Sequence, residues 1–116
     1  MIDYFSIAKV VYQANKTFCE TNFDFSHMDW NDAPDGVKCS YVRGVVEVIN
    51  NPNITPEELH EAWKKEKTGQ GWVLGENKNP DKKTHPCLTN YRDIPEFEKR
   101  KDNLFIAIVK ELIKEQ

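Results

Sequence analysis

The segment from His60 to Pro95 constrains the fold more than any other part of the chain. It reads HEAWKKEKTGQGWVLGENKNPDKKTHPCLTNYRDIP and holds two of the three tryptophans, a Gly-Gln-Gly turn and a His-Pro pair. Glycine and proline at these positions interrupt regular structure, so the segment cannot form one continuous helix. No simple helical or strand period explains this density of special residues. We therefore expect a shaped loop region, and we expect any ligand to bind there.

A helix leads into this segment. Thr55-Pro56-Glu57-Glu58 has the pattern of a complete capping box, with proline at the first helical position. The helix should run to about Thr68, and Gly69 and Gly71 should provide a left-handed stop. Trp72 to Leu74 then predicts a short strand, and Pro86 to Leu88 a second strand pairing with it.

Helical periodicity governs the flanking regions. Residues 3–20 place apolar side chains at three- and four-residue steps, and so does a segment beginning at Pro34, with Asp32 as its N-cap. Gly44 inside that second helix indicates close approach of another helix, because a mid-helix glycine costs about 1 kcal/mol. A last helix from about Pro95 to Lys114 has an almost continuous apolar middle.

These elements predict a mainly α fold of the α+β kind. We expect four to five helices packed around a central C-terminal helix, with a short antiparallel two-stranded β element. At 116 residues, one domain covering 1–116 is expected.

Charge distribution narrows the ligand class. The net charge of −3 disfavours a nucleic-acid binder, which usually needs a basic face. Residues 60–92, however, carry seven Lys or Arg against four Asp or Glu. This local excess favours a small anionic ligand near the segment.

Neither a metal nor a cofactor site is predicted. Cys19, Cys39 and Cys87 show no zinc-ligand or redox spacing, and the three histidines are far apart. Phosphate-loop and dinucleotide fingerprints are absent, and no acid-base or nucleophile constellation is legible. We expect no catalytic residues and a protein that is not an enzyme.

The sequence contains no cationic leader followed by an apolar run, and its apolar runs are far shorter than the roughly 20 residues of a membrane span. We expect a cytoplasmic protein without membrane contact.

Trp63 and Trp72 allow two interpretations. Either both belong to the core, as tryptophans commonly do, or one or both form an aromatic platform for a planar ring. In the second case Lys67, Lys82, Lys83 and Arg92 would contact anionic groups of the ligand. The complete set of candidate ligand-binding residues is His60, Trp63, Lys67, Trp72, Lys82, Lys83, His85, Tyr91 and Arg92.

The run HEAW, Lys67, GQGWVLG, DKKTHPCL, Tyr91 and Asp93-Ile94-Pro95 resembles the ryanodine receptor repeat domain, the RyR domain. The resemblance is dense from Thr55 to Pro95, and looser from the first helix to Pro34. It implies a small helical domain that occurs in tandem in animal calcium-release channels and singly in bacteria and phages. This chain resembles the single type and contains no channel.

In the animal channels the cleft of the paired repeats has been linked to adenine nucleotides stacking on tryptophan. Trp63 and Trp72 match the tryptophans on either side of the glycine turn. The resemblance therefore implies a sensor module for an adenine-containing or related anionic small molecule. The tandem arrangement implies an alternative, a protein-interaction or scaffold module that homodimerises.

Overall fold

Four α-helices and two very short strands make up the chain in the computed structural model, which describes residues 2–114. The helices are α1 (Tyr4–Thr21), α2 (Asp35–Asn50), α3 (Pro56–Gly69) and α4 (Glu96–Ile113). The strands are β1 (Val73–Leu74) and β2 (Thr84–His85), and the 3-10 turns are η1 (Trp30–Asp32) and η2 (Tyr91–Asp93). The mainly α class is confirmed.

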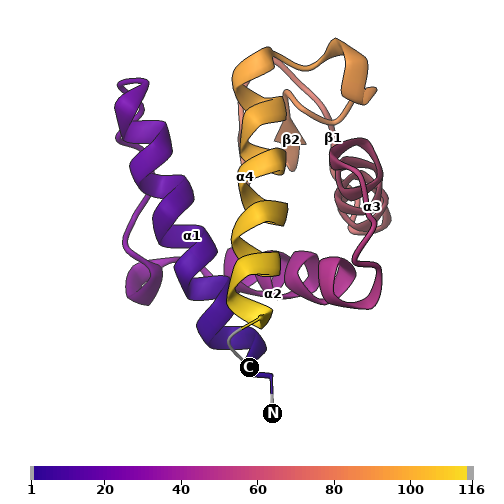
Figure 1. The fold of residues 1–116 in the computed structure, drawn as a ribbon. Coiled ribbons are helices and arrows are strands. Elements are labelled where there is room, and N and C mark those ends of the chain that lie inside the picture. Colours follow the sequence, from indigo (N-terminus) through magenta and orange to yellow (C-terminus); the bar gives the residue numbers. More distant parts are fainter. Residues whose placement is uncertain (1, 115–116) are drawn as a thin grey trace.

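The C-terminal helix occupies the centre of this arrangement. In Figure 1, α4 runs beside α1, α2 crosses the lower part of α4, and α3 lies on the other side of α4. α4 contacts all three other helices. The core between α1, α2 and α4 contains the fully buried Val11, Val45, Val48 and Val109.

Local capping signals explain where α3 begins. The Thr55 hydroxyl accepts a hydrogen bond from the Glu58 amide at 3.1 Å, and the Glu58 carboxylate accepts one from the Thr55 amide at 3.0 Å. This reciprocal pair satisfies two amides that the helix leaves free. At the other end Gly71 adopts a φ of +90°, which confirms it as the left-handed residue, whereas Gly69 is still helical.

The start of α2 differs from the prediction. Pro34, rather than Asp32, is the N-cap, and it provides no side-chain hydrogen bond. Asp32 is part of η1, where its amide donates to the Asp29 carbonyl at 2.9 Å. The aspartate therefore ends a preceding turn instead of capping the helix.

Gly44 marks the closest contact between α2 and α4. A Cβ atom at this position would lie 2.7 Å from Cζ of Phe105, well inside van der Waals contact. The absence of a side chain at Gly44 thus leaves room for the Phe105 ring, and the predicted close approach of another helix to α2 is confirmed.

The expectation of an antiparallel β element is wrong, because β1 and β2 are parallel. The Val73 amide donates to the Lys83 carbonyl at 2.8 Å, and the Gly75 amide to the His85 carbonyl at 3.3 Å. Between the strands the chain reverses twice, first between Leu74 and Asn79 and then between Asn79 and Thr84, which form an antiparallel bridge around a turn that includes Lys83 at a φ of +55°. The second reversal restores the direction of β1, and it places the second strand at 84–85 rather than 86–88.

Within residues 2–114, no helix has the length and apolar character needed to cross a membrane.

Candidate functional site

A cavity of about 1390 Å³ lies between α2, α3, α4 and the loops that follow α1 and β1. Five of the nine predicted ligand-binding side chains line it: His60, Trp63, Lys67, Trp72 and His85. Both tryptophans are half-buried, so neither is a fully enclosed core residue. The third, Trp30, is buried in the core.

Trp63 is the centre of an aromatic group on the cavity wall. Its ring meets the His85 ring edge to face, with centroids 5.0 Å apart, and lies 5.6 Å from the His60 ring. His60 comes from the preceding turn of α3 and His85 from β2, so the helix and the strand together form this group. The arrangement leaves Trp63 at the cavity surface with an imidazole on two of its sides.

Hydrogen bonds fix the orientation of both histidines. His60 Nε2 lies 2.9 Å from the Thr89 carbonyl oxygen, which can only accept, so Nε2 carries the proton. His85 Nδ1 accepts from the Cys87 amide at 3.0 Å, so in neutral His85 the proton sits on Nε2. Burial, reinforced by the positive charges of Lys78, Lys101 and Lys67, lowers the pKa of His85 to about 4. His85 is therefore a neutral hydrogen-bond donor at neutral pH.

The same three lysines form the cationic part of the cavity. Lys67 places its ammonium 5.3 Å from the centre of the Trp72 ring. Lys101 pairs with Glu98 at 2.8 Å, and this pairing outweighs burial and raises the pKa of Lys101. Lys78 belongs to the loop between the strands and also lines the cavity. All three line the cavity together with His85, and burial and their positive charges together lower the pKa of that histidine.

The polar wall supplied by α4 was missed by the sequence analysis. Glu98, Lys101 and Asp102 line the cavity, and Lys101 and Asp102 come three and four residues after Glu98, the spacing of a single helix face. Burial, together with the negative charge of Glu98, raises the pKa of Asp102 to about 7. In the sequence, charged residues at helical spacing are typical of a solvated helix surface. Their shared spacing was therefore the only feature that could have indicated a polar cavity wall.

Four predicted residues lie outside the cavity lining: Lys82, Lys83, Tyr91 and Arg92. Lys83 donates to the Gln70 carbonyl at 2.9 Å and so stabilises the glycine turn. Arg92 is 84% exposed, and the Tyr91 ring packs against His60 from outside the cavity. The sequence suggested Lys67, Lys82, Lys83 and Arg92 as one group of contacts for an anionic ligand. Of these four, only Lys67 lines the cavity.

The RyR domain family has a sequence model that matches residues 34–114 of this chain. The match includes α2, α3, both strands and α4, and therefore the elements that supply Trp63, Trp72 and His85. It covers more than two thirds of the 116 residues. The chain belongs to the RyR domain family.

Proposed function

We propose that this RyR domain is a non-enzymatic binding module that recognises an adenine-containing anionic small molecule in the cavity beside Trp63. The observation that carries the proposal is the position of Trp63 at the cavity surface, between two histidines and near three lysines.

The aromatic group suits a planar heterocycle. A half-buried indole offers one face for stacking, and stacking of a base on an aromatic side chain contributes about 1–3 kcal/mol. His85 adds an Nε2–H donor within the same group, since its Nδ1 is occupied by the Cys87 amide. A purine ring has nitrogen acceptors at its edge that such a donor can meet.

The lysines suit the anionic part of the ligand. Lys67, Lys78 and Lys101 line the cavity and act electrostatically on His85, although Glu98 and Asp102 on α4 offset part of their charge. Affinity should therefore come from stacking together with local pairing, and not from the overall field. A phosphate group near Lys67 and Lys78 satisfies this balance best, because neither lysine takes part in a side-chain ion pair within residues 2–114.

Isothermal titration calorimetry with ATP, ADP-ribose and cyclic nucleotides tests the proposal directly. We expect saturable binding to at least one of them, abolished by Trp63→Ala and partly retained by Trp63→Phe. No heat from any of these ligands at millimolar concentration would refute it.

A matched pair of lysines tests the anionic part. Lys78 and Lys82 belong to the same loop, but only Lys78 lines the cavity. Lys78→Ala should weaken binding about tenfold, the effect of one charge-assisted contact, while Lys82→Ala should leave it unchanged. Equal losses from the two variants would place the ligand outside the cavity.

Exposed apolar side chains favour a second candidate function, a homodimerising interaction module. Val73 and Leu74 on β1 are each 58% exposed, and the loop after α1 exposes Phe23, Phe25 and Met28. Multi-angle light scattering over a concentration series tests this candidate: a dimer that Leu74→Lys dissociates supports it, and a strict monomer at high concentration excludes it.

A further inference from the structure

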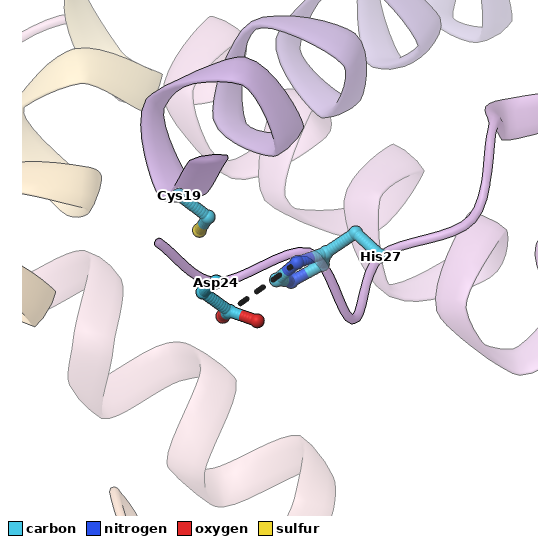
Figure 2. A group of neighbouring side chains, drawn as sticks. All are labelled: Cys19, Asp24 and His27. Carbon is cyan, nitrogen blue, oxygen red and sulfur yellow. Dashed lines mark ion pairs between the residues drawn. The ribbon is translucent and has the colours of Figure 1, made fainter. Parts of the chain in front are cut away.

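Three side chains of different metal-binding types converge where α1 ends. Cys19 lies in the last turn of α1, and Asp24 and His27 lie in the loop that follows (Figure 2). Their ligand atoms all lie within 4.8 Å of one another. The sequence predicts no metal site here, since the spacing of these residues matches no familiar zinc motif.

The turn at Phe23 brings the three together. The Asp24 amide donates to the Cys19 carbonyl at 3.0 Å and the Phe23 amide to the Glu20 carbonyl at 3.0 Å, the pattern of a Schellman turn. Phe23 adopts the left-handed conformation that this turn needs, with a φ of +61°. The chain therefore folds back over Cys19, and Asp24 returns to the level of the thiol.

The free ligand atoms face inward. Asp24 Oδ1 accepts from the Ser26 amide and hydroxyl, which leaves Oδ2 toward His27. His27 Nδ1 is 3.8 Å from that oxygen, too far for a hydrogen bond. Nδ1 is buried, and within residues 2–114 it is the buried side-chain polar atom that has no hydrogen-bond partner. A buried orphan nitrogen is costly unless something meets it.

We propose that Cys19, Asp24 and His27 form a three-ligand site for a transition-metal dication, with Zn²⁺ as the best fit. In a tetrahedral zinc site, ligand atoms are about 3.3–3.6 Å apart, so shifts of about 1 Å would close this group around an ion. Mixed sulfur, nitrogen and oxygen ligands suit zinc, whereas magnesium and calcium prefer oxygen alone.

Charge balance supports the assignment. On binding, the Cys19 thiol releases its proton to solvent, so thiolate and carboxylate together neutralise the dication. The positive charge of Lys101 acts on Cys19, but its ammonium is paired with the Glu98 carboxylate at 2.8 Å and not with Asp24. Asp24 and His27 also line the large cavity, so the fourth position of the ion opens toward it and takes a water molecule.

This site lies outside the region that the family model matches, which begins at residue 34. It is thus built by this chain's N-terminal helix and loop, from three residues that the nucleotide proposal does not use, although two of them line the same cavity.

Titration of the full-length, metal-free chain with Co²⁺ under reducing conditions tests the site. We expect one equivalent to bind, with a thiolate-to-cobalt charge-transfer band in the near ultraviolet and the intense visible bands of tetrahedral cobalt. Zn²⁺ should displace the cobalt and raise the melting temperature, because it binds the folded state.

Matched variants separate the site from adventitious binding. His27→Gln and Asp24→Asn change partly exposed loop residues, and each should weaken Zn²⁺ binding at least about tenfold. Cys39→Ser and Asp29→Asn alter an exposed thiol and an exposed carboxylate elsewhere, and should bind like the unmodified chain. Absence of the thiolate band, or its loss in Cys39→Ser but not in His27→Gln, would overturn the proposal.

Discussion

Asp102 is the residue whose ionisation conflicts most with its surroundings. Its neighbours are Glu98 and Lys101 on α4 and Tyr91 on η2, and burial is the main cause of the rise in its pKa to about 7. Between pH 4 and 7 the folded chain holds a proton on Asp102 that the unfolded chain releases. Stability from this group is therefore lost as the pH rises through that window.

Asp102→Asn should stabilise the domain more at pH 8 than at pH 4. The difference between the two pH values in its effect on the free energy of unfolding should be about 1–2 kcal/mol after allowance for solvent screening. The lowered pKa of His85 acts in the opposite sense, because stability from this group rises with pH between about 4 and 6.5. Its contribution cancels when the variant and the unmodified chain are compared at each pH. Urea unfolding at both pH values gives the answer, and an equal effect at pH 4 and pH 8 would contradict it.

Phe23 is a second residue at odds with its conformation. It is 86% exposed and has a positive φ, which costs about 1–2 kcal/mol for a non-glycine residue. Phe23→Gly should raise the free energy of unfolding by about 0.5–1 kcal/mol, the strain relieved less the added entropy of the unfolded chain.

Phe25→Gly is the natural control, because Phe25 is similarly exposed but has no positive φ. It should destabilise the domain slightly. If both glycine variants shift the urea midpoint in the same direction, the strain at Phe23 is not what limits stability.

At the level of elements, the contact between α2 and α4 rests on the absence of a side chain. Gly44→Ala should destabilise by about 1 kcal/mol, because the clash with Phe105 exceeds the gain in helix propensity. In the background of Phe105→Leu the same substitution should become neutral or stabilising, since the ring is gone.

Gly36 provides the comparison within the same helix. A Cβ there would meet nothing within 4 Å, so Gly36→Ala should stabilise by up to about 1 kcal/mol. A double-mutant cycle on Gly44 and Phe105, measured by thermal and urea unfolding, gives the coupling. Additive effects would show that the ring simply moves aside.

At the scale of the whole molecule, α1 completes the core although it precedes the matched family region. Five of its apolar side chains are buried, and they pack on α2 and α4 or close the end of the helix: Ile7, Ala8, Val11, Tyr12 and Cys19. Truncating one large core side chain costs a few kcal/mol of unfolding free energy, so losing all five should cost considerably more.

We therefore expect a fragment of residues 30–116 to lack a cooperative thermal transition. Addition of a peptide of residues 2–29 should restore helical circular dichroism beyond the sum of the two parts. The single variant Val11→Ala, by comparison, should fold with a loss of about 1–3 kcal/mol. A sharp, native-like melt of the fragment alone would show that the matched region folds independently.

The mainly helical fold, the capping box of α3, the role of Gly44 and the family could all be predicted from the sequence. Each depends on a local period, a short motif or the absence of a side chain, and such signals act over a few residues. Their physical cause is backbone hydrogen bonding and the burial of one helix face, which neighbouring residues alone can specify.

Three features could not be predicted from local patterns: the direction of β2, the choice of basic residues that reach the cavity, and the meeting of Cys19 with Asp24 and His27. The strand direction depends on the left-handed backbone conformation of Lys83, and the metal-binding group on that of Phe23. Lysine and phenylalanine rarely adopt this conformation, so the sequence does not predict it. Lys101 reaches the cavity because the packing of α4 between α1 and α3 selects the helix face that turns inward. Such choices are made by contacts between elements, so no spacing within one element could reveal them.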